Sequence, residues 1–101
     1  MKNQAQDTYV SRLLVVDDEE NVAITVSEIL RREGYLVDTS YNGEDAMHSL
    51  HTANVPYDLV VTDLHMESLD GLSVLSELRR HFPTTIAVVL TGFGSLESAV
   101  A

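Results

Sequence analysis

A chain of 101 residues, of which 45% are hydrophobic, has the size and composition of one globular domain. Its 16 acidic residues against 6 basic ones give a net charge of −10, which argues against direct binding to the phosphate backbone of nucleic acids. The absence of cysteine excludes disulfides and thiolate metal sites, and no apolar run suits a membrane span or an export signal, so we expect a cytoplasmic domain.

The first residues are polar and predict an N-terminal arm over residues 1–10, followed by one domain over residues 11–101. After its first residue, the stretch Arg12–Val16 is a continuous apolar run, which is typical of a strand buried on both faces of a sheet. The run is followed directly by acids, beginning with Asp17 and Asp18. Each of these two can be a cap of the next helix or a ligand at the end of a strand.

Residues 20–33 have the spacing of an amphipathic helix, with acids in the first turn and arginines in the last. Gly34 then predicts a C-terminal cap. The expected apolar face consists of Ala23, Val26, Ile29 and Leu30.

The rest of the chain continues to alternate strands with helices. The predicted strands cover residues 35–40, 58–63 and 85–90, and the predicted helices cover residues 44–51 and 71–81. The first of these strands is the most polar, which places it nearer a sheet edge, whereas the other two are apolar and predict buried strands. Ser95 is placed to cap a further helix. This alternation predicts an α/β fold, a doubly wound parallel sheet with helices on both faces.

The run Asp58–Asp63 is the most informative strand, because an apolar segment ends on the carboxylate of Asp63. In a parallel sheet all carboxyl ends lie at one edge, where ligands bind. Asp17 and Asp18 follow the first strand, and Thr91 with Gly92 follows the last. These groups can therefore meet at one edge if their strands are neighbours.

Three carboxylates in one crevice repel one another and favour a hard divalent cation such as Mg²⁺, which prefers oxygen ligands. With the cation present, a phosphoryl oxygen can approach and Asp63 can act as a carboxylate nucleophile. The hydroxyl of Thr91 and the backbone N–H groups near Gly92 would then face the arriving oxygens. For each residue taken alone, a structural role is the simpler interpretation, and only their joint placement favours a reactive site.

Four motifs of the chain, in this order and on these elements, resemble the receiver domain of bacterial two-component response regulators. They are Leu14-Val15-Val16-Asp17-Asp18-Glu19, Asp58-Leu59-Val60-Val61-Thr62-Asp63-Leu64-His65-Met66, Leu69-Asp70-Gly71-Leu72 and Val88-Val89-Leu90-Thr91-Gly92. The stretch from Leu90 to Val100 is most similar to the NtrC group. The resemblance implies a CheY-like, flavodoxin-like sheet with strand order 2-1-3-4.

The resemblance also implies a role for each site residue. Asp63 would be the phosphoacceptor for a sensor histidine kinase, and Thr91 would be the switch hydroxyl. Mg²⁺ would be held by Asp17, Asp18, Asp63 and the backbone carbonyl of His65. The phosphoryl group would be contacted by Leu64, Thr91 and Gly92. Such a domain is a signalling module, and its only chemistry is self-directed phosphoryl transfer and autodephosphorylation.

The chain departs from the family pattern in two respects. Glu67-Ser68 stands where the family usually has Pro-Gly, which predicts an altered loop after Met66. The family also has a fifth strand with a lysine that contacts the phosphoryl group, and a last helix; no such segment follows residue 90 in this sequence. We therefore expect a C-terminally incomplete receiver whose output domain is absent, with homodimerisation through the exposed fourth strand or the missing C-terminal face.

Two other functions compete with a phosphorelay module. The chain can be a pseudo-receiver that pairs with partners without switching, or a small phosphatase that uses Asp63 as nucleophile. The second is disfavoured because His65 stands where such phosphatases carry a general acid. His48 and His51 are three residues apart on a helix and can in principle share a metal, but the sequence offers no third ligand.

Overall fold

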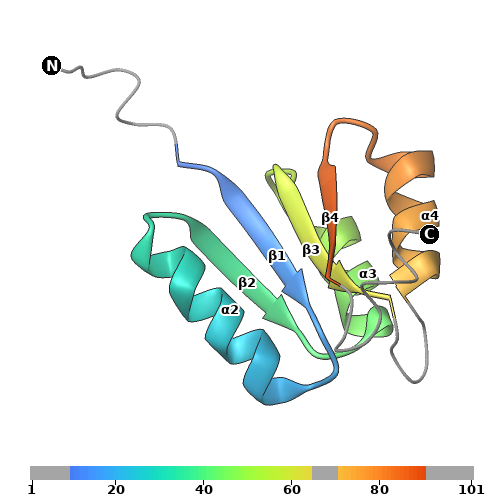
Figure 1. Cartoon of the computed structure of the whole chain (residues 1–101). Coiled ribbons are helices and arrows are strands. Elements are labelled where there is room, and N and C mark those ends of the chain that lie inside the picture. Colours follow the sequence, from blue (N-terminus) through green and yellow to red (C-terminus); the bar gives the residue numbers. More distant parts are fainter. Residues whose placement is uncertain (1–9, 65–70, 91–101) are drawn as a thin grey trace, which may run out of the picture.

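The structure is a computed structural model and describes residues 10–64 and 71–90 (Figure 1). Each element begins and ends within one residue of its predicted range. The order is β1 (Arg12–Val16), α2 (Glu20–Arg32), β2 (Leu36–Ser40), α3 (Gly43–Thr52), β3 (Leu59–Asp63), α4 (Gly71–His81) and β4 (Ile86–Leu90). The predicted arm, apart from Val10, and the predicted helix at Ser95 lie outside the described residues.

The four strands form one parallel sheet with the order β2-β1-β3-β4, which confirms the doubly wound α/β fold. Helix α2 covers one face, and α3 and α4 cover the other (Figure 1). Each face has its own core. Leu14 and Val16 of β1 pack on the α3–α4 side, whereas Leu13 and Val15 pack on the α2 side. The apolar run of β1 is therefore continuous because β1 is buried on both faces.

Helix α2 ends as predicted, with Gly34 at φ +100°. The Gly34 N–H donates to the carbonyl of Arg31, and the Tyr35 N–H donates to that of Leu30, which is the Schellman arrangement. The apolar face predicted for α2 is wrong at one position, because Ile29 is 53% exposed. A buried serine, Ser27, takes part in the packing instead.

The Ser27 hydroxyl is buried because it has a partner on the sheet. Its Oγ lies 2.7 Å from Oγ1 of Thr39 in β2, so each hydroxyl satisfies the other where water is excluded. Hydrogen bonding thus attaches α2 to β2 at Ser27, while Ile29 is exposed.

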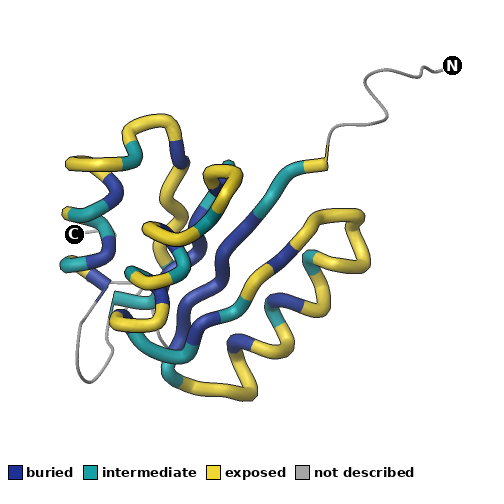
Figure 2. The backbone as a smooth tube through the Cα atoms, turned by 180° about the vertical axis from the view of Figure 1, so that it is seen from behind, coloured by how far each residue is buried: buried dark blue, intermediate teal, exposed yellow. Residues whose placement is uncertain are grey.

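Strand β4 differs from its prediction as a buried strand. All its residues except the half-buried Leu90 are exposed, and Ile86 reaches 62% (Figure 2). In the same view β1 is buried almost throughout. Within the described residues β4 pairs only with β3, so it forms one edge of the sheet. Within the described residues, an apolar strand thus forms an open edge of the sheet, which is a surface suited to pairing.

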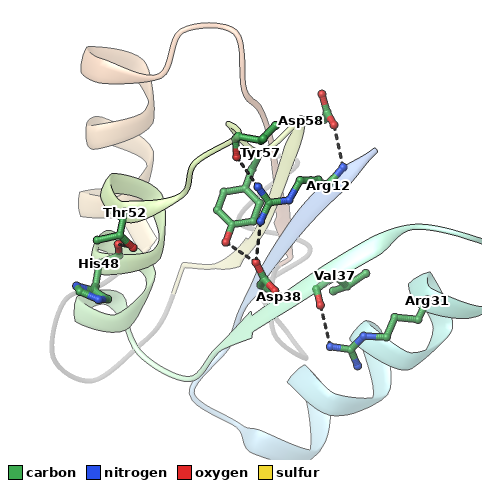
Figure 3. Close-up of polar contacts among 9 residues, drawn as sticks. Arg12, Arg31, Val37, Asp38, His48, Thr52, Tyr57 and Asp58 are labelled. Carbon is green, nitrogen blue, oxygen red and sulfur yellow. Dashed lines mark hydrogen bonds and ion pairs between the residues drawn. The ribbon is translucent and has the colours of Figure 1, made fainter. Parts of the chain in front are cut away.

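Near the amino ends of β1 and β3, polar side chains tie three segments together (Figure 3). An Arg12 guanidinium nitrogen lies 3.2 Å from Asp38 Oδ2, and the Tyr57 hydroxyl donates to the same oxygen at 2.6 Å. The guanidinium also lies 4.8 Å from the centre of the Tyr57 ring. In addition, the backbone N–H of Arg12 donates to the Asp58 carboxylate at 2.8 Å. These contacts join β1, β2 and the entry to β3.

None of the helices within residues 10–64 and 71–90 has both the length and the apolar character that a membrane span requires.

The Tyr57 phenol provides a test of this polar cluster. Burial, and the hydrogen bond to Asp38, raise the pKa of Tyr57 to about 12. The folded state then keeps its proton between pH 10 and 12, where the unfolded chain loses it, so the free energy of unfolding falls across this window. We expect the advantage of the wild type over Tyr57→Phe to shrink by on the order of 2 kcal/mol between pH 9.5 and 12. Urea unfolding at each pH measures it, and a constant difference between the two proteins would contradict the assignment.

Candidate functional site

Two neighbouring strands end on acids at the same edge of the sheet. Val16 of β1 pairs with Thr62 of β3, so the residues that follow, Asp17 and Asp63, lie beside each other. One carboxylate oxygen of each of Asp17, Asp18 and Asp63 lies within 4.8 Å of the others. The structure therefore brings together the three acids that the sequence predicted at this edge.

Asp17 is held from two sides. Its backbone N–H donates to the carbonyl of Ser40, the last residue of β2, at 3.1 Å. Its Oδ1 accepts the backbone N–H of Glu19 at 2.9 Å. The N-cap of α2 is Glu19, without a side-chain cap hydrogen bond, so neither Asp17 nor Asp18 occupies the cap position. The alternative interpretation of these two acids as helix N-caps is wrong.

Burial of Asp17, which is only 5% exposed, raises the pKa of its carboxyl group. The hydrogen bond from Glu19 opposes this shift, and the charges of Asp63, Asp18 and Glu19 add to it. The raised pKa means that ionised Asp17 disfavours the metal-free fold as pH rises above the ordinary value near 3.8. A cation at this point would remove both the repulsion and the cost of burial.

The donor set fits Mg²⁺. An octahedral Mg²⁺ ion holds oxygens at about 2.0–2.1 Å, so opposite ligands lie about 4.2 Å apart. The three carboxylate oxygens, which all lie within 4.8 Å of one another, are close to this separation. Asp18 and Asp63 are half-buried, which leaves one side open for water or a phosphoryl oxygen.

The backbone of Asp63 is fixed by its neighbours along the chain. Thr62 is fully buried, and its hydroxyl donates to the Asp63 carbonyl at 3.1 Å. Leu64 is half-buried directly after the strand, and its carbonyl accepts the N–H of Gly71 at 3.3 Å. Sequence reasoning assigned no role to Thr62 or Gly71. The only signal was Asp70-Gly71 in a motif, which alone indicates a turn.

Three predicted site residues, His65, Thr91 and Gly92, lie outside the described residues. Their roles, and the phosphate contact of Leu64, stay predictions. Leu90, the last residue of β4, pairs with Asp63. The chain thus leaves β4 beside the acidic cluster.

The histidines of α3 do not form a second metal site. His51 Nε2 lies 2.6 Å from a Glu77 carboxylate oxygen on α4, and His48 is exposed. In the described part of the chain, the acidic cluster is the one group that brings three ligand atoms within 4.8 Å. His51 and Glu77 instead join the two helices that cover this face.

Comparisons with known proteins agree with this acidic site. A family profile described as "Response regulator receiver domain" matches residues 13–101. Among curated proteins, regulatory protein AtoC of Escherichia coli is 33% identical over 93 residues, which are 92% of this chain and 20% of AtoC. This chain therefore spans about a fifth of the length of that relative.

Two solved structures with a similar fold carry groups that bear on this site. Response regulator TrrA from Thermotoga maritima, in complex with Mg²⁺ and BeF, is 38% identical with a TM-score of 0.78, over 88% of this chain and 76% of TrrA. A response regulator from Burkholderia pseudomallei, with a phosphorylated aspartic acid, a calcium ion and citrate, is 32% identical with a TM-score of 0.76, over 89% of this chain and 52% of that one.

The acidic cluster predicts that a divalent cation stabilises the fold. At a free Mg²⁺ concentration ten times the Kd, mass action adds about 1.4 kcal/mol to the free energy of unfolding. Asp17→Asn keeps the acceptor for the Glu19 N–H but removes a buried charge. We expect it to stabilise the metal-free chain by about 1 kcal/mol and to abolish the response to Mg²⁺.

Thermal unfolding with MgCl₂, against NaCl of equal ionic strength, measures this response. Glu28→Gln is the matched control, since Glu28 is an exposed acid on α2 outside the cluster. An equal gain from Mg²⁺ in Asp17→Asn and in the wild type would show that the cation acts elsewhere.

Proposed function

Since this chain belongs to the family of response regulator receiver domains, we propose that it accepts a phosphoryl group on Asp63 from a sensor histidine kinase. The observation that carries this proposal is the meeting of Asp17, Asp18 and Asp63 within 4.8 Å at the carboxyl edge of the sheet. Such a cluster is a poor anion site by itself and a good one once a divalent cation is bound. The Mg²⁺–BeF and phosphoaspartate of the two similar structures support the same chemistry here.

In the proposed reaction, a carboxylate oxygen of Asp63 attacks the phosphorus of the kinase phosphohistidine. An O–P bond forms, the N–P bond breaks, and the imidazole leaves with the electron pair and takes up a proton. Mg²⁺ would be held by Asp17, Asp18, Asp63 and the backbone carbonyl of His65. When bound, Mg²⁺ neutralises charge on the phosphoryl oxygens, which is the main electrostatic demand of phosphoryl transfer.

The remaining roles follow the family pattern. Thr91 is the switch hydroxyl that moves toward the phosphorylated Asp63, and backbone groups of Leu64 and Gly92 contact the phosphoryl oxygens. The pairing of Asp63 with Leu90 supports this assignment, because Thr91 follows Leu90 directly. The chain would then act on itself only, through phosphoryl transfer and autodephosphorylation, and not as an enzyme on other substrates.

The signal would pass to a partner outside this chain. The curated relatives that it matches over about a fifth of their length include transcriptional regulators, so the proposed output is control of transcription by a C-terminal domain. The domain itself would not touch nucleic acid, since its net charge is −10. As a response regulator receiver domain, the chain would meet this kinase in the cytoplasm.

A second proposal concerns self-association. The exposed apolar residues of β4, with an open strand edge, favour pairing with a second copy of the chain. The same exposed edge would also serve a pseudo-receiver, which pairs with partners and does not switch.

Phosphorylation of Asp63 is tested directly. With Mg²⁺ and acetyl phosphate, we expect the wild-type chain to gain the mass of one phosphoryl group, and Asp63→Asn to gain none. Intact mass spectrometry measures the gain, and Mg²⁺ with beryllofluoride observed by NMR gives a stable analogue of the product. A wild type that shows no change dependent on Asp63 would exclude the phosphoacceptor role for this chain.

Self-association is tested by light scattering after size exclusion at micromolar concentration. We expect the wild-type chain to form dimers, and the double substitution Ile86→Lys/Val88→Lys to give monomers, because lysines disfavour pairing at a strand edge. Leu72→Lys on α4 is the control, since its side chain is as exposed as that of Ile86. A monomeric wild type that melts cooperatively would contradict pairing through β4.

A further inference from the structure

Helix α4 begins unusually close to the backbone of the acceptor strand. Its first residue, Gly71, donates its N–H to the Leu64 carbonyl at 3.3 Å. A Cβ placed on Gly71 would lie 2.1 Å from the carbonyl oxygen of Asp63, 2.7 Å from the Cα of Leu64 and 2.9 Å from the carbonyl carbon of Asp63. All three are backbone atoms, so no side-chain rotation can make room.

Conformation is not the reason for glycine here. Among the described residues, only Gly34 has a positive φ. Gly71 adopts a backbone that alanine also adopts, and alanine is excluded by contact alone. The two glycines therefore separate two effects, since Gly34 has nothing within 4 Å of its missing Cβ.

The atom that a Cβ would strike belongs to the proposed acceptor. The Asp63 carbonyl accepts the Thr62 hydroxyl at 3.1 Å, and Asp63 is paired with Leu90 of β4. To accept a methyl group on Gly71, this carbonyl and α4 must separate by roughly 1 Å to reach normal van der Waals contact. Asp17 and Asp18 follow a different strand and would not move with it.

We propose that Gly71 is a positioning residue for the phosphoacceptor, whose missing side chain lets α4 close against the backbone of Asp63. The contact fixes the backbone of Asp63, and with it the direction of its carboxylate toward Asp17 and Asp18. This inference rests on the proposed function of Asp63. A displacement of about 1 Å in a reacting group lowers rates by roughly a hundredfold, so a small shift suffices.

The test compares Gly71→Ala with Gly34→Ala in the same chain. For each protein, the rate of phosphorylation by acetyl phosphate and the Kd of Mg²⁺ are measured and divided by the folded fraction from urea unfolding. We expect Gly71→Ala to lose roughly tenfold or more in rate and to bind Mg²⁺ more weakly, per folded molecule. We expect Gly34→Ala to be less stable, because alanine is strained at φ +100°, with unchanged rate and Mg²⁺ affinity.

A merely structural role for Gly71 would lower the folded fraction and leave both normalised quantities at their wild-type values, which overturns the proposal. If Gly71→Ala does not fold, Thr62→Val removes the other contact to the Asp63 carbonyl at nearly constant volume. We then expect a slower rate and weaker Mg²⁺ binding at unchanged stability, and wild-type values would again overturn the proposal. If the wild type itself takes up no phosphoryl group, the proposed function fails, and the Mg²⁺ affinities alone still decide the role of Gly71.

Discussion

The repulsion among three carboxylates at one edge of the sheet is the constraint around which this fold is arranged. Parallel pairing of β1 with β3 places Asp17 beside Asp63, and Asp18 adds a third acid. Burial raises the pKa of Asp17 and so makes the cluster unfavourable for the metal-free fold at neutral pH. Strands β1 and β3, which lead to the acids, are apolar and packed, and their packing offsets this repulsion. The stability of the domain is thereby linked to the cation that the site would bind.

Two other acids, Asp38 and Asp58, lie toward the opposite ends of these strands and have different surroundings. There Asp38 meets Arg12 and the Tyr57 hydroxyl, and Asp58 accepts the Arg12 backbone N–H. The acids at this end have donors from the protein itself, which satisfies the usual requirement for polar groups at the edge of a core. At the carboxyl end Asp17 also accepts a backbone N–H, from Glu19, but there three acids bring carboxylate oxygens within 4.8 Å of one another. This asymmetry along the strands sets the edge with the candidate site apart from the opposite one.

The sequence predicted what depends on local pattern and on the geometry of parallel sheets. The strand ends at Asp17 and Asp63 are correctly placed together because parallel pairing leaves no other arrangement for neighbouring strands. The hydrophobic pattern predicted burial wrongly where burial depends on a neighbouring element. Strand β4 is as apolar as β1 and yet is exposed. On α2, Ile29 is exposed while Ser27 is buried. The role of Gly71 was also beyond the pattern, because it depends on a close approach to the backbone of Asp63 and Leu64, eight and seven residues earlier in the chain.

Strand β4 connects the site to the surface of the domain. Its last residue, Leu90, pairs with Asp63, and its other residues are exposed. Anything that pairs with β4 or covers it therefore acts on the strand whose end lies beside the acceptor. In the other direction, a shift of Asp63 against Gly71 changes the pairing of β3 with β4 at its final rung. Under the proposed function, a phosphoryl group on Asp63 would lie beside the end of β4, the strand whose exposed edge is the proposed pairing surface.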